Sequence, residues 1–548
     1  MFRLDILLLG LCVLVVPSFA DDATVFTSLG RIKGVQTVDK ETGKKVYEFR
    51  GIRYAKPPTG ERRFRKPDPV EPWEGEYDAT NFGYACPQSV NELFDDKSKN
   101  QSEDCLFLNI YVPRSISSEE KLSVMVWIHG GGFIIGNGHF YDGTRLAVDG
   151  NVVVVTINYR LGILGFLALY HPASRGNYGL WDQKLALHWI SDYIEAFRGN
   201  PASITIFGES AGGMSVSAQS LIPSNKDLFQ RVIAQSGVIS RTLLVRKKVA
   251  RKALERLPAK TKCKPDDLFQ FVDCLRQVDV EILLEASSFW NYLPEDSVTL
   301  ETVYGVVVDG EIFPEHPVKL LQDPSSHHAV MLRSLDFMTG TTSQEGSLIY
   351  MSVPPNVQER YNFNISENIP SDFICEGILR PFIRLNYKGN DAIYKKGCKF
   401  FTSVGSKEEL RNRAADLFAD MMFTSATREM LNFHTKQKRG KTYQYQFSKI
   451  SPKPFAIPPP KWFKGSGHGD ELLYLFRSEK ENRPGMIDIT LTGHDRRVSD
   501  DMISLWTSFA KTGTPSTGKG SIPWIEYDPH SRVYMDIECT NVIKTKLK

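Results

Sequence analysis

The chain shows two hydrophobic patterns, one typical of strands and the other of helices. Residues 124–128 are nearly all apolar, which predicts a strand covered on both faces, and 152–157 form the most β-branched run in the chain. Between 180 and 197, apolar side chains recur at three- and four-residue intervals, which predicts one face of a helix. Residues 204–207 return to a strand pattern, and a helix-length segment follows. The pattern alternates strand, helix, strand and helix.

This alternation predicts an α/β fold with a large, mostly parallel sheet and helices on both faces. Residues 27–53 alternate apolar and polar positions, which indicates small antiparallel strands at a sheet edge. From about 243 to 324 the pattern is helical and irregular, which indicates an excursion over a site. Further strands are expected at 106–112, 337–340, 443–447 and 533–537, a Pro-rich surface connection at 56–72, and a last amphipathic helix at 502–511 that stops near Gly513.

The composition is that of a globular protein able to bury a sizeable core. Of the 548 residues, 41% are hydrophobic, 24% charged and 11% aromatic. Because 67 basic and 64 acidic residues leave a net charge of only +3, neither nucleic acid nor a strong membrane-surface preference is indicated. No linker or repeat divides residues 21–548, so we expect one domain.

The first 20 residues have the features of a signal peptide. Arg3 precedes an apolar run from 6 to 16, and Ser18-Phe19-Ala20 fits a cleavage site. The run is too short for the roughly 20 residues of a spanning helix, and the carboxyl end shows no retrieval or lipid-anchor signal. Secretion is therefore expected. Two sequons, at Asn100 and Asn364, fit that compartment, although such tripeptides also arise by chance.

The cysteines indicate an oxidising compartment and exclude complete internal pairing. Seven remain once residues 1–20 are removed, and no C-x-x-C pair suggests zinc. Short local loops favour two pairs, a third pair is plausible, and one thiol is left over, while the sequence alone leaves the connectivity open. The pairs are Cys86 with Cys105, Cys263 with Cys274 and Cys375 with Cys398, and the remaining thiol is Cys539.

Residues 208–212, GESAG, match the G-x-S-x-G turn that presents a nucleophilic serine between a strand and a helix. The flanking glycines are needed because a Cβ there would collide with neighbouring backbone while the serine is strained. Ser210 would stand at the carboxyl end of its strand, where α/β sheets place ligands. The pattern alone also fits an ordinary helix-entry turn.

A serine nucleophile needs a base, and the base needs a carboxylate to orient it, in the chain order Ser, Asp/Glu, His. His468 lies in the glycine-rich loop GSGHGDE, and Glu345 lies in the turn-rich segment GTTSQEG. An exposed loop histidine and an exposed turn carboxylate are the plainer alternatives for these two residues. No step of this chemistry requires a metal or an organic cofactor.

An oxyanion also needs donors, and HGGGF at 129–133 follows a predicted strand as the HGGG-type loop of esterases does. Glycines let backbone N–H groups approach a carbonyl oxygen, so Gly131, Gly132 and the N–H of Ala211 would share its developing charge. A tight strand exit is the alternative. The loop, the turn and both partners occur in the required order, which makes coincidence unlikely to explain them.

These motifs resemble the type-B carboxylesterase/lipase family of the α/β-hydrolase fold over essentially the whole mature chain. Residues 197–212 match the family's serine signature, and 103–110 match its second signature except at Phe107. The resemblance implies Ser210 as nucleophile, Glu345 as acid, His468 as base, and Gly131, Gly132 and Ala211 as oxyanion hole. It also implies the disulfides Cys86–Cys105 and Cys263–Cys274. Thr342 stands where relatives usually have Asn.

Within the resemblance, the expected substrates are neutral carboxylic esters in a roomy acyl site. Cholinesterases place a tryptophan in the loop between Cys86 and Cys105, and this loop has none. Leu300 and Thr302 align with the acyl-pocket phenylalanines of acetylcholinesterases, and Glu209 is expected as a buried carboxylate near His468. The alternatives are a lipase or cholinesterase of the same family, or a catalytically inactive adhesion protein; the triad positions are filled, which favours the enzyme.

Overall fold

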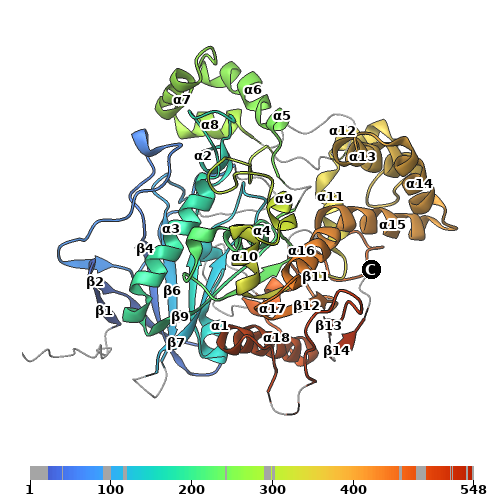
Figure 1. The fold of residues 1–548 in the computed structure, drawn as a ribbon. Helices are drawn as coiled ribbons and strands as arrows, with labels where there is room; N and C mark the ends of the chain where they lie inside the picture. Colours follow the sequence, from blue (N-terminus) through green and yellow to red (C-terminus); the bar gives the residue numbers. More distant parts are fainter. Residues whose placement is uncertain are drawn as a thin grey trace, which may run out of the picture.

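The computed structural model has an 11-stranded sheet at its centre, with helices on both faces (Figure 1). Strands β7 to β13 pair in parallel, and antiparallel strands complete both edges, in the order β14-β13-β12-β11-β10-β9-β7-β8-β6-β4-β3. The large, mostly parallel sheet predicted from the sequence is therefore confirmed. The structure describes residues 23–39, 41–89, 100–114, 120–240, 244–288, 298, 303–455, 459–476, 489–518, 520, 522–538 and 541–545.

Most strands of this sheet, and of a three-stranded sheet ordered β1-β2-β5, lie close to predicted positions, whereas β1, β5, β10 and β14 have no predicted counterpart. Edge strands formed where apolar and polar residues alternate between 27 and 53. The bounds are β1 Thr24–Thr27, β2 Gly30–Lys33, β3 Val35–Val38, β4 Lys45–Arg53, β5 Glu76–Asp78, β6 Phe107–Pro113, β7 Leu122–Ile128, β8 Val153–Ile157, β9 Gly199–Glu209, β10 Arg231–Gln235, β11 Asp336–Thr342, β12 Thr442–Phe447, β13 Tyr534–Ile537 and β14 Val542–Lys544.

The central strands are buried because each face packs against its own core. In β7, Val124 and Val126 face one core, while Met125 and Trp127 face the other. This split follows from side chains that alternate across a strand. Helices α3 and α4 cover the first face, and α1 and α18 cover the second. The helices up to the fourth are α1 Thr144–Gly150, α2 Gly162–Phe166, α3 Tyr178–Tyr193 and α4 Ala211–Gln219, with short helices η1 Gly60–Arg62, η2 Gly138–Phe140, η3 Ile194–Phe197 and η4 Pro223–Asn225.

The predicted excursion after the elbow is present as short helices near the top of Figure 1 and beside the sheet. Helix α7 begins at an Asp267 side chain that accepts the N–H groups of Phe269 and Gln270, which is an N-cap. The bounds are α5 Lys247–Ala250, α6 Lys252–Thr261, α7 Leu268–Gln277, α8 Val280–Ala286, α9 Pro317–Gln322 and α10 His327–Ser334.

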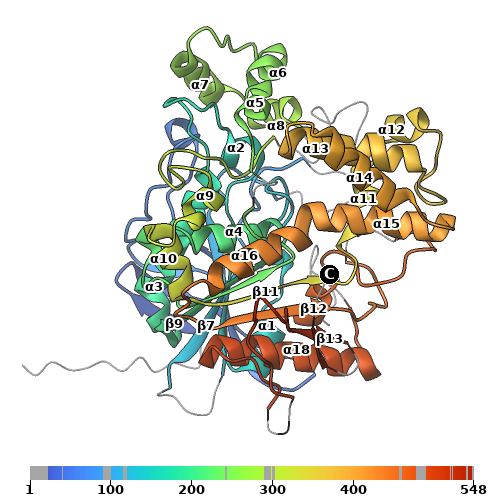
Figure 2. The same cartoon turned by 45° about the vertical axis from the view of Figure 1, so that its right-hand side comes forward.

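A second helical excursion, between residues 345 and 435, has no counterpart in the predicted elements. Helices α11 to α15 form a lobe with its own hydrophobic core, beside the sheet in Figures 1 and 2. We call this set of helices the helical lobe. Its elements and the helix that leads back to the sheet are η6 Glu345–Leu348, α11 Ile349–Ser352, α12 Pro355–Arg360, η7 Phe373–Leu379, α13 Arg380–Asn386, α14 Asp391–Thr402, α15 Lys407–Ala419, η8 Asp420–Thr424 and α16 Ser425–Thr435.

The last helices are α17 Leu472–Leu475 and α18 Gly493–Thr512. Helix α18 ends before Gly513, whose φ of 69° is left-handed, as the sequence predicted. It begins at residue 493 rather than 502. The sequence did not predict these first turns, because they are rich in charged residues and show little apolar periodicity. No helix among the described residues has both the length and the apolar character needed to cross a bilayer.

Candidate active site

The turn at Ser210 joins β9 directly to α4. Ser210 has φ 57° and ψ −122°, a conformation that costs a non-glycine residue energy and that its surroundings must enforce. A Cβ on Gly212 would lie 2.0 Å from the carbonyl oxygen of Ile128, and one on Gly208 would lie 2.5 Å from the same atom. Both glycines are therefore required for the elbow to pack against the end of β7.

The glycine loop that follows β7 lies against this elbow. A Cβ on Gly130 would be 2.7 Å from the Glu209 carbonyl oxygen and 3.2 Å from Cβ of Ser210. Gly131 and Gly132 have φ values of 100° and 62°, and within the described chain neither N–H has a hydrogen-bond partner. The Ala211 N–H belongs to the first turn of α4, where N–H groups have no intrahelical acceptor.

Glu345 and His468 meet in a buried hydrogen bond although 123 residues separate them. Glu345 Oε2 lies 2.6 Å from His468 Nδ1, and the Glu345 side chain is only 1% exposed. The two loops also pair through their backbones, because the Gln344 N–H donates to the Ser466 carbonyl at 2.9 Å. The His468 N–H donates to Ser347 Oγ at 2.9 Å. These bonds fix the imidazole relative to the end of β11.

The second oxygen of Glu345 is held by two further donors. The backbone N–H of Thr342 donates to Oε1 at 2.7 Å, and the Ser236 hydroxyl donates to the same oxygen at 2.5 Å. The Thr342 hydroxyl has no partner among the described residues. The backbone, not the side chain, of Thr342 therefore supports the carboxylate, so the Thr in place of the usual Asn leaves this bond intact.

The other ring nitrogen of His468 faces Glu209 rather than Ser210. Nε2 lies 3.0 Å from Glu209 Oε1, and no hydrogen bond between the Ser210 hydroxyl and the imidazole occurs in the described structure. Glu209 Oε1 makes no hydrogen bond to Nε2 despite this distance, and the two nearby carboxylates favour the charged imidazolium electrostatically. Ser210 is the next residue after Glu209; Ser210 and His468 are partly exposed, whereas Glu209 is buried.

The electrostatics agree with this resting arrangement. Burial disfavours the charge on His468, but the carboxylates of Glu209 and Glu345 outweigh burial and raise the pKa of His468 to about 9. Burial raises the pKa of Glu209 to about 7, against the opposing effect of the His468 charge. The imidazole therefore holds a proton more firmly than an ordinary histidine does.

Three residues around the site were missed by the sequence analysis. Ser236 follows β10 in a left-handed conformation, φ 47°, and the polar QSG after an apolar strand was the available signal. Glu471 shares the loop of His468; burial and the nearby Glu209 carboxylate raise its pKa well above the usual range. Phe423 packs on the imidazole with ring centroids 4.7 Å apart, from the π-helical segment η8, and no local pattern announced it.

The remaining predicted residues fall in three groups. Leu300, Thr302, Cys539 and the predicted signal peptide lie outside the described residues. Asn100 and Asn364 are described and exposed, a position that glycosylation requires. The disulfides present are Cys86–Cys105, Cys263–Cys274 and Cys375–Cys398.

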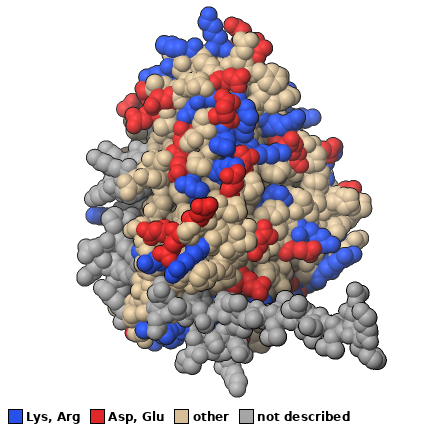
Figure 3. Space-filling view, turned by 90° about the vertical axis from the view of Figure 1, so that its left-hand side faces the viewer, with Lys and Arg blue, Asp and Glu red and all other residues tan. Residues whose placement is uncertain are grey.

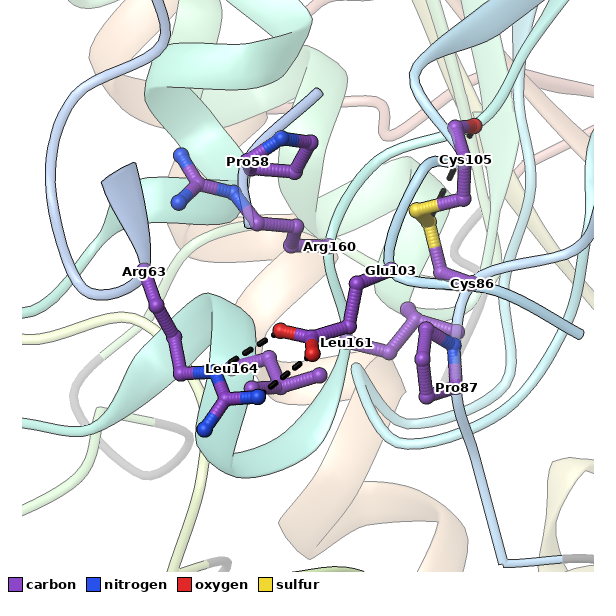
Figure 4. Close-up of a pocket in the computed structure, with 9 residues that line it drawn as sticks. All are labelled: Pro58, Arg63, Cys86, Pro87, Glu103, Cys105, Arg160, Leu161 and Leu164. Carbon is purple, nitrogen blue, oxygen red and sulfur yellow. Dashed lines mark hydrogen bonds and ion pairs between the residues drawn. A yellow bond between two sulfur atoms is a disulfide. The ribbon is translucent and has the colours of Figure 1, made fainter. Parts of the chain in front are cut away.

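A narrow pocket beside the first disulfide is separate from these groups (Figure 4). Arg63 and Glu103 form an ion pair in its wall, with Arg63 Nε 2.8 Å from Glu103 Oε2. The pocket leaves no room for a water molecule, and none of the predicted catalytic residues lines it. The ion pair ties the segment of the second signature to the N-terminal part of the chain, which is a structural role.

The comparisons with known proteins agree with the geometry. Residues 21–548 match the family described as "Carboxylesterase family". The chain is 34% identical to the bile salt-activated lipase of Bos taurus over 543 residues, covering 96% of this chain and 85% of that one. It is 33% identical to carboxylesterase 1D of Rattus norvegicus over 545 residues, covering 96% and 91%.

A third relative is the medium-chain fatty acyl-CoA hydrolase precursor of Anas platyrhynchos, 32% identical over 544 residues, with 96% of this chain and 91% of that one covered. The α/β-hydrolase fold expected from the sequence is confirmed by this family match and by the observed sheet. The chain belongs to the carboxylesterase family of carboxylic ester hydrolases.

Proposed function

We propose that Ser210 is the nucleophile of this esterase, with His468 as its base and Glu345 as the orienting acid. The observation that carries the proposal is the buried Glu345–His468 hydrogen bond of 2.6 Å, on an imidazole whose other nitrogen reaches the residue before Ser210. His468 takes the Ser210 proton as Oγ attacks the ester carbonyl, and Glu345 stabilises the imidazolium. The alcohol then leaves with that proton, and an acyl-enzyme remains.

The contact with Glu209 implies that the imidazole of His468 takes two positions, one facing Glu209 and one facing Ser210. For catalysis, Nε2 leaves Glu209 and turns to the adjacent Ser210, a small change of a kind that is common between free and substrate-bound enzymes. The proton on Nε2 must also pass to the Glu209 carboxylate, 3.0 Å away, because only a neutral imidazole accepts a proton from serine. Before substrate binds, the Glu209 carboxylate thus stabilises the charged form of His468.

The oxyanion of each tetrahedral intermediate would lie among the N–H groups of Gly131, Gly132 and Ala211. The unpaired N–H groups of the glycine loop, next to the elbow, support this role. Such a donor typically contributes about 3 kcal/mol of transition-state stabilisation. Water then attacks the acyl-enzyme with His468 again as base, which releases the acid and restores Ser210.

Neutral carboxylic esters are the proposed substrates, and Glu209, Leu300 and Thr302 are the proposed residues of their binding site. The loop closed by Cys86–Cys105 contains no tryptophan to hold a quaternary ammonium. Among the relatives are a lipase, a carboxylesterase and a fatty acyl-CoA hydrolase, and each of these names describes an enzyme that hydrolyses an acyl compound. We further propose one catalytic domain over 21–548, supported by a sheet that takes strands from both ends of the described chain.

Secretion is part of the same proposal. It is supported by the signal-like residues 1–20, by three disulfides and by exposed Asn100 and Asn364 in sequons. These features favour an oxidising compartment outside the cytosol.

The test compares the protein with a Ser210→Ala variant on a short-chain p-nitrophenyl ester. Removing the nucleophile of a serine triad lowers kcat by about 10⁶-fold, so the variant should retain only background hydrolysis. Matched circular dichroism spectra would show that both proteins are folded. Equal turnover by the two proteins would contradict the assignment of Ser210.

A further inference from the structure

Helix α14, in the helical lobe, has an unusual surface: it contains no fully buried side chain. Phe400 is 61% exposed and Ile393 is 39% exposed. These two residues are seven positions apart, so they lie on one face of the helix. Tyr387, which precedes the helix, is 49% exposed. Three large apolar side chains therefore reach solvent within a short segment.

Lysines accompany this apolar stripe. Residues 380–402 have a net charge of +5, so this segment is one of several basic stretches of the chain. The basic residues of this segment are Arg380, Arg384, Lys388, Lys395, Lys396 and Lys399, and its acidic residue is Asp391.

The local acids are already paired. Asp391 forms an ion pair with Lys395 at 2.7 Å, and Glu376, nearby on η7, binds Arg380. Lys388, Lys396 and Lys399 are exposed and form no ion pair with any described residue. The surface made by Tyr387, Lys388, Ile393, Lys396, Lys399 and Phe400, which we call the α14 surface, thus combines uncompensated cations with exposed apolar groups.

The charge pattern on the opposite side of the molecule differs from that of the α14 surface. The side shown in Figure 3 has Lys and Arg interspersed with Asp and Glu, without a large area of one sign. The α14 surface is also rigidly attached, because the Cys375–Cys398 disulfide joins α14 to η7, which contributes to the core of the lobe. The same lobe continues into η8, where Phe423 contacts the imidazole of His468.

We propose that the α14 surface docks the protein onto an anionic lipid–water interface. Phosphate headgroups would pair with the lysines, while Phe400 and Ile393 would insert at the boundary between headgroups and acyl chains, as amphipathic interfacial helices do. Lysine is depleted at protein–protein interfaces, whereas lysines beside an exposed apolar stripe are typical of helices that lie at a lipid interface, which favours the lipid. This inference rests on the proposed function in one respect, that such an interface brings ester substrate near the site.

The experiment uses the mature full-length protein and sedimentation with vesicles of phosphatidylcholine, alone or mixed with phosphatidylglycerol. The test variant is Lys388→Gln/Lys396→Gln/Lys399→Gln, and the matched control is Lys44→Gln/Lys45→Gln/Lys226→Gln, which changes three exposed lysines outside the helical lobe. Each lysine near an anionic surface strengthens binding about fivefold. The test variant should therefore bind the mixed vesicles about a hundredfold more weakly, and the control should bind like the parent protein.

A second variant separates insertion from charge. Phe400→Ser removes the most exposed apolar group of the surface and should weaken binding at high salt, where lysine attraction is screened. Turnover of a soluble p-nitrophenyl ester, measured on every preparation, should be unchanged. Absence of binding to mixed vesicles, equal binding to neutral vesicles, or equal losses in the test and control variants would overturn the docking proposal. Equal turnover of the soluble ester by Ser210→Ala and the parent protein would contradict only the proposed function, so the two proposals fail separately.

Discussion

The carboxyl end of the sheet and the helical lobe contribute to the site in different ways. The sheet end positions Ser210, Glu345 and the glycine loop through turns that directly follow β9, β11 and β7. Most of the glycines in these turns lie so close to neighbouring backbone that a side chain would clash. The lobe contributes through packing: its separate core places Phe423 on the imidazole of His468. The proposed catalytic groups lie where strands end, and a region with its own core packs against the imidazole of His468.

We therefore expect the two regions to respond differently to substitution. Changes among the hydrogen-bonded groups at the sheet end should alter rates by orders of magnitude and shift the pH dependence. Changes in the lobe should alter rates by small factors. The predictions below are ordered by that expectation.

The largest effect is expected for Glu345→Gln. The amide keeps the shape of the side chain but loses the charge that stabilises the imidazolium, so kcat/KM should fall about 10⁴-fold, as for the corresponding change in other triads. Stopped assays with a p-nitrophenyl ester measure it. The control is Thr342→Val, because the Thr342 hydroxyl makes no bond and its backbone N–H is retained. A fall for Thr342→Val as large as that for Glu345→Gln would show that the carboxylate has no special role.

These two positions also show how far the sequence leads. Ser210, the glycine loop and His468 could be picked out because each lies in a short, glycine-rich segment with a recognisable sequence pattern. Most strands were predicted because their apolar runs are continuous and buried on both faces. The hydrogen bond from Ser236 to Glu345 could not be predicted, since it depends on the register between β10 and β11.

The helical lobe was not predicted for a related reason. Its core is shared among short segments far apart in the sequence, so no single segment indicates that they pack together. The contact of Phe423 with His468 follows from the π-helical turn at η8, which shifts the helix face by a residue. No local feature of the sequence identifies such a turn.

A smaller effect, on pH dependence, is expected for Glu209→Gln. Glu209 stabilises the charged imidazole, so its loss lowers the pKa of His468 from about 9. Activity requires the neutral imidazole and therefore rises with pH through this pKa; the acidic limb of kcat/KM should move to lower pH by about one unit. A full pH profile of both proteins measures it. An unmoved limb, or a move to higher pH, would contradict the resting Glu209–His468 contact.

The smallest effect is expected in the lobe, for Phe423→Leu. Leucine keeps an apolar contact with His468 but lacks the flat ring, so the imidazole is less restricted and kcat should fall only about threefold to tenfold, within the 0.5–1.5 kcal/mol of an aromatic pair. The acidic limb should stay in place, because Phe423 carries no charge. A thermal unfolding curve checks that the lobe remains folded. A loss of several orders of magnitude would remove the distinction between the two regions.

The central claim is that one hydroxyl, that of Ser210, is the group activated by His468. It is tested most directly by treating the protein with an organophosphate and locating the covalent adduct by mass spectrometry of its peptides. The account predicts stoichiometric inactivation with the adduct on Ser210, and no adduct in His468→Ala under the same conditions. An adduct on another residue that accompanies full loss of activity would contradict it.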